Sequence, residues 1–456
     1  MKKSIIYLFS TVALMTSAAC TEIEDGYEDI DSWESIDVKP KVYTLNHPCL
    51  MHSQSDIDYV KAHLSQSPWS EAYQKLITNS YAQPTYKASP KEYVARLDAT
   101  NWADGGGRWT QYGVLDKWYP GVQNSYTYLM RDAAAAYQLA LRYVLSGDTD
   151  CATAAIQILN DWATVNKGMI YGTQGTLKDE LIDSNEFLIL FQIYQVANAA
   201  ELLRDFNGWG NTDEYKKVVT WLKTYFYPEA SRFLATKSGT HYWLNWDLAC
   251  MTACISIGVL DDNQDMINEA TMHYMTERGI GAGKHLNAIP YIHEDPDHAG
   301  FMLGQCNESG RDQGHATLCA TMLGIFCQMA NNVGEDLFAY ADYRACAMAE
   351  YVAKYNATTG GNGVSFMFPQ NKVPYTTYNF QDHDMTAISE DGRGSVRPGW
   401  DVWVGYANAH GRACYYTDAL MGEVRPDGGG GHYGGNSGGF DQTGFSTLMF
   451  YRPPQN

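Results

Sequence analysis

The feature that most constrains the fold is a series of apolar segments with helical spacing, which runs from about residue 55 to about residue 360. Each segment has about 12 to 20 residues, short loops separate the segments, and strand-type alternation is nearly absent. Pro68 is expected to break the first segment, so that Trp69 opens a second helix, and Gly147 is expected to end the next. The predicted helical segments are residues 55–75, 129–145, 153–165, 186–204, 214–227, 246–259, 265–277, 316–332 and 337–355.

This pattern predicts an all-α fold in which helical hairpins follow one another as an (α/α) toroid or barrel, or as a solenoid, since periodicity alone does not separate these. The last hundred residues differ, because they are rich in Gly, Tyr and polar residues. Residues 428–439 form a Gly-rich loop, and residues 400–415 predict one more helix. No linker divides the chain, so we expect a single large domain over residues 41–456 with an irregular C-terminal part.

The N-terminus predicts export. Lys2 and Lys3 precede a short apolar stretch, residues 5–15, and small residues then lead to Cys20. The stretch is too short to span a bilayer, and the small residues before Cys20 resemble a bacterial lipobox. We therefore expect residues 1–20 to be a lipoprotein signal peptide that ends at a lipidated Cys20; the alternative is an ordinary secretory signal cleaved nearby.

The region that follows the signal predicts a tether at the cell envelope. Residues 21–37 carry eight acidic residues and only scattered apolar ones, which is typical of a solvated segment, so we assign residues 21–40 to a flexible tether. No later stretch approaches eighteen uninterrupted apolar residues, so the lipid is the only membrane anchor expected. We expect the protein at the outer membrane, facing the periplasm or the medium.

Composition excludes some partners. The net charge of −20 argues against nucleic acid, whose binding proteins usually present a basic face. The 33 Tyr and 12 Trp are suited to stacking on sugars, although core packing accounts for most such rings. Nine cysteines remain after Cys20, an odd number with no CxxC pair, so we expect few or no disulfides.

The densest group of chemically active residues is GQCNESGRDQGH, residues 304–315, directly before an apolar helix. The start of a helix offers unsatisfied N–H groups and the positive end of the dipole, which favours a carboxylate ligand. Arg311 and His315 are four residues apart and would share one helix face. Capping and interhelix hydrogen bonding are the structural alternative.

A second group, residues 241–247, opens another apolar helix with His241, Trp243 and Asn245. Core packing is a strong alternative for Trp243. Between the two groups, residues 290–298 contain Tyr291 together with imidazoles and carboxylates. This loop lacks a recognised ligand spacing, so a solvated acidic loop is favoured over a cation site, and we expect no metal and no cofactor.

Three runs carry a family resemblance: GQCNESGRDQGHATL, LNWDLACMTACISIGVLDD at residues 244–262, and RPGWDVWVGYANAHG at residues 397–411. They resemble the alginate-lyase-like superfamily of helical-toroid polysaccharide lyases, and within it polysaccharide lyase family 38. The resemblance extends from about residue 40 to the C-terminus. It implies an (α/α) toroid that cleaves uronic acid polymers, such as alginate or glucuronan, by β-elimination.

The resemblance also implies roles for the catalytic candidates. The C5 proton of a uronate is removed readily only when its carboxylate is neutralised, and the departing O4 needs an acid. Asn245 stands where related lyases grip the carboxylate, but Trp246 follows it where many relatives have His. The base is then His241 or His315; His315 stands where some relatives have a catalytic Tyr, and Arg311 precedes it. Tyr291 is the candidate proton donor.

The remaining candidates are substrate-binding residues: Gln305, Glu308, Asn124, Asn185, Trp243, Arg397 and His410. Two other functions stay open at the level of sequence. One is a toroidal glycosidase that uses a carboxylate pair such as Glu308 and Asp312. The other is a non-catalytic glycan-binding lipoprotein. In each case the expected partner is an anionic polysaccharide, and we expect a monomer.

Overall fold

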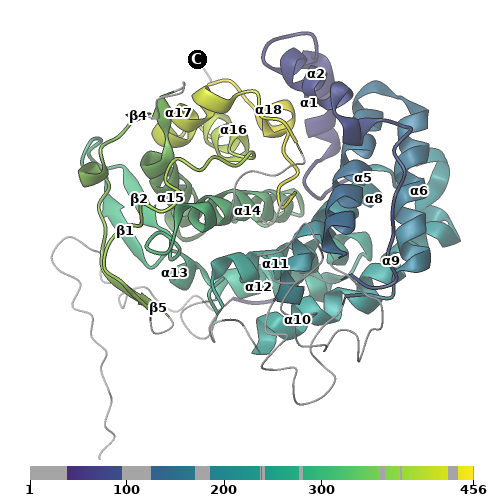
Figure 1. The fold of residues 1–456 in the computed structure, drawn as a ribbon, viewed down its shortest axis with the longest axis horizontal. Coiled ribbons are helices and arrows are strands. Elements are labelled where there is room, and N and C mark those ends of the chain that lie inside the picture. Colours follow the sequence, from purple (N-terminus) through teal and green to yellow (C-terminus); the bar gives the residue numbers. More distant parts are fainter. Residues whose placement is uncertain are drawn as a thin grey trace, which may run out of the picture. The chain divides into compact units, whose positions relative to one another are not determined.

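The computed structural model describes residues 38–94, 125–169, 185–236, 238, 242–276, 281–359, 365–380, 383–429 and 440–454. These residues belong to one compact unit, residues 37–456. Its helices follow one another in chain order around an arc (Figure 1). The first two are α1 (Gln54–His63) and α2 (Trp69–Thr78). As predicted, the first segment is two helices, and the second begins at Trp69.

The helices form two layers. An inner row consists of α5 (Tyr126–Ser146), α8 (Ile193–Leu202), α11 (Leu244–Leu260) and α14 (Gln313–Asn332), each packed against the next. An outer row covers it and consists of α6 (Thr149–Val165), α9 (Asp213–Tyr225), α10 (Tyr227–Thr236), α12 (Gln264–Met275) and α15 (Tyr340–Asn356). Consecutive helices alternate between the rows over much of the chain, which is the α/α arrangement predicted.

The C-terminal helices close the ring. They are α16 (Asp401–Ala409), α17 (Tyr415–Val424) and α18 (Ser446–Phe450). α18 packs against both α1 and α2, and Arg452 just beyond it binds Asp56 of α1 at 2.9 Å. The described unit is therefore a toroid of helices rather than an open solenoid.

Local sequence explains where the helices end and how deeply they lie. Gly147 ends α5 with φ of 76°, a left-handed conformation that glycine adopts without strain. α11 is apolar on all sides, and every residue in it except Trp246 is buried. A helix without a polar face belongs in a core, and α11 indeed packs against α8, α10, α12 and α14.

Two helical predictions need correction. The segment around residues 186–204 begins as a 3₁₀ helix, η4 (Asn185–Gln192), before α8. A further helix, α10, occupies a stretch with no prediction, and residues 400–415 are divided between α16 and the start of α17. Shorter 3₁₀ turns are η2 (Ser80–Ala82), η5 (Phe206–Asn211) and η6 (Gln370–Lys372), and α13 (His285–Ala288) is a single turn.

The described residues also form three short antiparallel hairpins: β1 (Tyr291–Glu294) with β2 (Met302–Gln305), β3 (Thr358–Thr359) with β4 (Ser365–Phe366), and β5 (Tyr378–Phe380) with β6 (His383–Met385). In the first, Tyr291 lies opposite Gln305. The loop predicted at residues 290–298 is therefore partly a strand, because residues 291–294 pair with residues 302–305.

Two further observations concern the cysteines and the helices. All nine cysteines after Cys20 lie within the described ranges, and none is paired. In the described part of the chain, no helix combines the length and hydrophobicity that crossing a bilayer requires.

Candidate active site

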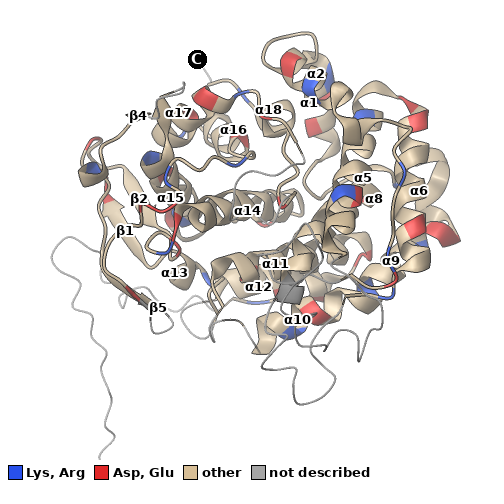
Figure 2. Ribbon diagram, viewed as in Figure 1, with Lys and Arg blue, Asp and Glu red and all other residues tan. Residues whose placement is uncertain are grey.

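The two polar groups singled out in the sequence meet where α11 and α14 begin. These helices lie side by side, and their ribbons are almost free of charged residues (Figures 1 and 2). Asp247 is the only Asp, Glu, Lys or Arg in α11, and α14 contains none. The charges near this junction therefore come from the helix starts and from the turn that precedes α14.

Glu308 connects the start of α11 to the turn that precedes α14. Its carboxylate is fully buried, Oε2 accepts a hydrogen bond from Arg311 Nη1 at 3.2 Å, and Oε1 lies 3.5 Å from the backbone N–H of Asn245. The Arg311 guanidinium also lies 5.3 Å from the ring centre of Trp243, a cation–π distance. With its side chain 32% exposed, Arg311 presents positive charge to solvent at this point. Glu308 thus positions Arg311 beside Asn245.

Asp312 and His315 form an oriented carboxylate–imidazole pair. Asp312 is the N-cap of α14, and its Oδ1 accepts the backbone N–H of His315 at 2.8 Å. Its Oδ2 lies 2.6 Å from His315 Nδ1. Burial would raise the pKa of Asp312, but the hydrogen bonds from His315 and the nearby positive charge of Arg311 hold it below its usual range. A bond at Nδ1 places the imidazole lone pair at Nε2, as general-base chemistry requires.

Asn245 has unused hydrogen-bonding capacity. The residue is 3% exposed, and its Oδ1 is buried without a hydrogen-bond partner among the described groups. Asn307 and Ser309, in the turn before α14, also have buried side-chain polar atoms without such a partner. Buried polar groups are normally paired, so unsatisfied groups concentrated here mark a place where a ligand or water supplies the missing bonds.

The irregular C-terminal part provides one wall of this region. Gln313 donates its backbone N–H to the carbonyl of Asp391 at 2.8 Å and its side-chain amide to the carbonyl of Ser389 at 3.0 Å. A Cβ added at Gly310 would collide with the hydroxyl oxygen of Tyr375. The segment after α15 therefore lies against the turn that carries Arg311.

Tyr291 and Gln305 lie on the hairpin beside this wall. Tyr291 is 8% exposed, and its ring packs edge-on against Tyr378 with centres 6.0 Å apart. Gln305 uses its whole amide within the protein: Oε1 accepts from the backbone N–H of Thr376 at 2.8 Å and lies 2.9 Å from His293 Nε2, and Nε2 donates to the carbonyl of Thr376 at 2.8 Å. Gln305 thus holds the wall in place rather than presenting an open amide.

Arg397 reaches the start of α14 from a buried position, whereas His410 lies far from the junction. Arg397 is 1% exposed, its Nε donates to the carbonyl of Gly314 at 3.2 Å, and its Nη1 forms a buried ion pair with Asp441 at 2.6 Å. His410 follows α16, where its ring stacks on Tyr406, and the Tyr406 hydroxyl binds Asp336, which follows the C-terminal end of α14. Since α14 has 20 residues, that end is about 30 Å from Asp312. The remaining candidates, His241, Asn124, the side chain of Asn185 and Cys20, fall outside the described residues.

The acidic loop at residues 290–298 is neutralised by the protein itself. Lys354 of α15 is fully buried, with Nζ 2.5 Å from Asp295 and 2.8 Å from Asp297. Burial would raise the pKa of Asp295, but hydrogen bonds from Lys354, Tyr416 and His298 hold it below its usual range. The ammonium group of Lys354 therefore supplies the positive charge that these two carboxylates require.

Lys354→Met is expected to destabilise the fold by about 3–5 kcal/mol, because it leaves a buried carboxylate without its counter-charge. Urea denaturation followed by circular dichroism measures the loss. Lys372→Met is the matched control: that ion pair with Asp297 is exposed and should contribute at most about 1 kcal/mol. If both variants lost the same free energy of unfolding, Lys354 would not be the essential counter-charge of this loop.

Two carboxylates at the helix starts, Asp312 and Asp247, enter the sequence-based predictions only as members of a hydrolase pair. The spacing of Asp312, three residues before His315, is nevertheless a recognisable N-cap signal. Asp247 is fully buried, and its Oδ1 binds Ser238 and His273, the latter at 2.8 Å. His273 comes from α12, and nothing in the sequence pairs it with Asp247.

A closed ring of helical hairpins, with Arg, His and Asn side chains at the starts of two inner helices, is the architecture of a helical-toroid polysaccharide lyase. A family model described as alginate lyase matches residues 76–362, a range that contains both helix starts. The chain belongs to the alginate lyase family, and it is a polysaccharide lyase. No curated protein sequence matches the chain significantly.

Solved structures share the fold. Alginate lyase A1-III from Sphingomonas species A1 aligns with a TM-score of 0.53 at 17% identity, covering 87% of this chain and 95% of that one. An alginate lyase from Bacteroides ovatus aligns with a TM-score of 0.53 at 15% identity, covering 89% and 99%. A histidine-to-alanine variant of A1-III in complex with a tetrasaccharide aligns with a TM-score of 0.52 at 15% identity, covering 87% and 94%.

Proposed function

We propose that this lyase cleaves uronate polymers of the alginate or glucuronan type by β-elimination, with its chemistry at the joined starts of α11 and α14. The observation that carries the proposal is the Asp312–His315 pair next to Arg311. Together these residues supply an oriented base and a positive charge, which are the two requirements for removing the C5 proton of a uronate.

In this proposal Arg311 and Asn245 bind the substrate carboxylate and stabilise the negative charge that develops as C5 loses its proton. Glu308 holds Arg311 in place, and Trp243 supports the guanidinium from its ring face. Loss of the C5 proton forms the C4–C5 double bond, and the bond from C4 to the glycosidic oxygen breaks. Water takes no part in the cleavage.

His315 is our choice of base, because Asp312 binds Nδ1 and so orients Nε2. Tyr291 is our choice of acid for the departing oxygen. Its support is its position on the hairpin β1–β2, where Gln305 fixes the neighbouring wall through Thr376. A glycosidase using Glu308 and Asp312 is disfavoured by their contacts, since Glu308 is bound to Arg311 and Asp312 to His315.

Incubation of the enzyme with polymannuronate, polyguluronate and glucuronan tests the reaction type. We expect ultraviolet absorbance to rise with at least one of these polymers, because each elimination leaves a double bond conjugated to the carboxylate. Mass spectrometry of the products should show unsaturated ends and no added water. Products that are each heavier by one water, without the absorbance, would identify a hydrolase instead.

We also propose that the enzyme is held at the cell envelope by a lipid on Cys20. Support comes from the sequence before it, with its basic start, short apolar stretch and small residues. We expect Cys20→Ser to abolish incorporation of labelled palmitate and to move the protein from the membrane pellet to the soluble fraction. Cys414→Ser, in the folded unit, is the control that should keep its label. A Cys20→Ser protein that still carries palmitate would contradict the anchor.

A further inference from the structure

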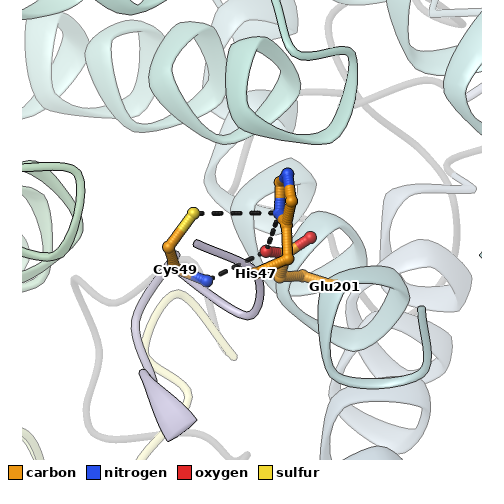
Figure 3. A group of neighbouring side chains, drawn as sticks. All are labelled: His47, Cys49 and Glu201. Carbon is orange, nitrogen blue, oxygen red and sulfur yellow. Dashed lines mark hydrogen bonds and ion pairs between the residues drawn. The ribbon is translucent and has the colours of Figure 1, made fainter. Parts of the chain in front are cut away.

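A cluster of His47, Cys49 and Glu201 lies outside the catalytic region (Figure 3). His47 and Cys49 belong to the segment before α1, and Glu201 belongs to the last turn of α8. One potential ligand atom from each residue falls within 4.8 Å of the other two. Figure 3 shows one imidazole nitrogen joined by dashed lines to the thiol and to the carboxylate, with the three side chains turned toward one another.

We propose that this cluster binds a zinc ion through His47 Nδ1, Cys49 Sγ and Glu201 Oε1. Nδ1 lies 2.6 Å from Oε1 and 3.7 Å from Sγ. Zinc binds imidazole nitrogen, thiolate sulfur and carboxylate oxygen at about 2.0–2.3 Å, usually with tetrahedral geometry. Ligand atoms at these separations reach a common ion after small adjustments of the side chains.

The groups around the cluster are those that accompany a metal-bound histidine. His47 Nε2 lies 2.8 Å from Asp262 Oδ1, so a carboxylate holds the ring nitrogen opposite the proposed ion. Metal-binding histidines usually donate this second N–H to such a partner, which fixes the ring and its tautomer. The backbone N–H of Cys49 donates to Glu201 Oε1 at 2.9 Å and orients that ligand as well.

Arg204 is the group that the ion must displace. Its Nη1 lies 3.2 Å from His47 Nδ1 and 3.3 Å from Glu201 Oε2, while its Nη2 is held 2.9 Å from Asp262 Oδ2. If the Arg204 guanidinium rotates about its contact with Asp262, Nη1 leaves the cluster while the ion pair between Nη2 and Asp262 is kept. With a thiolate at Cys49, the charges of Zn²⁺ and Arg204 balance those of the thiolate, Glu201 and Asp262.

Solvent has a path to the cluster. A surface pocket is lined in part by Pro48, Glu201, Arg204 and Asp205, and the side chains of His47 and Arg204 are each 18% exposed. An ion can therefore enter without unfolding of the toroid.

The proposed ion has a structural role. Asp262 follows the C-terminal end of α11, whereas Asn245 lies in its first turn. A helix of 17 residues is about 26 Å long, so the two sites lie at opposite ends of it. Zinc would join the segment before α1 to α8, and this inference stands apart from the proposed catalytic function.

Cobalt(II) titration of the chelator-treated protein tests the ligands directly. We expect a single equivalent to bind and to produce a sulfur-to-cobalt charge-transfer band, which zinc then abolishes by displacement. Cys49→Ser should bind cobalt without that band. Cys346→Ser is the control, because that thiol lies on α15 and should leave the band unchanged. A charge-transfer band that persists in Cys49→Ser would overturn the proposal.

The zinc affinities of Arg204→Gln and Glu201→Gln give a second, independent test, because the two substitutions should change the affinity in opposite directions. Removing the competing guanidinium should tighten zinc binding, whereas Glu201→Gln, which removes a ligand, should weaken it by more than the ~10–100-fold typical of losing an outer-shell partner. Zinc should also raise the Tm of the wild type and of Arg204→Gln, and it should raise that of Cys49→Ser by less because one ligand is lost, with circular dichroism confirming that each variant is folded. Absence of stoichiometric zinc binding in both the wild type and Arg204→Gln would show that the cluster is an ionic network only.

Discussion

Replacing His315 with alanine is expected to lower kcat by a factor of ~10²–10⁴, the usual contribution of a positioned acid–base group. The proposed reaction cannot begin without removal of the C5 proton, and the Asp312–His315 pair is the oriented base at the helix junction. The rise of ultraviolet absorbance on a uronate polymer measures the loss. His315 is half-buried at the start of α14, so circular dichroism should show an intact fold.

The Asp312→Asn variant distinguishes the two roles of Asp312, which are to orient His315 and to cap α14. Asparagine is as good an N-cap as aspartate, so α14 should remain stable. The amide does not hold the Nδ1–H tautomer as a carboxylate does, so kcat should fall well below that of the wild type. A near-normal rate in both His315→Ala and Asp312→Asn would assign the base to another residue, with His241 the next candidate.

Replacing Arg311 with methionine is expected to lower kcat/KM by ~10²–10³, as for the loss of one group that stabilises a developing oxyanion. Methionine keeps much of the apolar stem that packs beside Trp243 but removes the charge. The variant also leaves Glu308 buried without its cation, so its stability must be measured alongside.

Arg311→Lys is the matched control for charge. Lysine keeps the positive charge but not the planar guanidinium that reaches both Glu308 and a substrate carboxylate. We therefore expect a kcat/KM between that of Arg311→Met and that of the wild type. If the double variant Arg311→Met, Glu308→Gln regained wild-type activity, Arg311 would serve only to neutralise Glu308.

The helical architecture could be predicted because it depends on local rules. Pro68 cannot continue a helix, and Trp69 begins α2 as predicted; Gly147 adopts the left-handed conformation that ends α5. The 3₁₀ geometry of η4 could not be predicted in this way, since residues 186–204 carry apolar spacing that is equally compatible with an α-helix. Neither could the hairpin β1–β2, whose strands have only four residues each and depend on each other for hydrogen bonds.

Candidate site residues could be recognised by type and position, but their partners could not. Gln305 looked like an open amide, yet its whole side chain is bound to Thr376 and His293. Arg397 looked like a cation for a polyanion, yet Asp441, 44 residues later, buries it. In both cases a contact distant in sequence decides whether the polar group is free.

By itself, the sequence determined that the chain folds as helical hairpins and that Arg311, His315 and Asn245 stand at helix starts, because helix period, capping and termination act within a few residues. Only the tertiary structure decided that Glu308 ties the start of α11 to Arg311, that Lys354 neutralises Asp295, and that Glu201 meets His47 and Cys49. The residues in these contacts are 59 to 154 positions apart. Packing of the closed ring, rather than any local preference, brings them together.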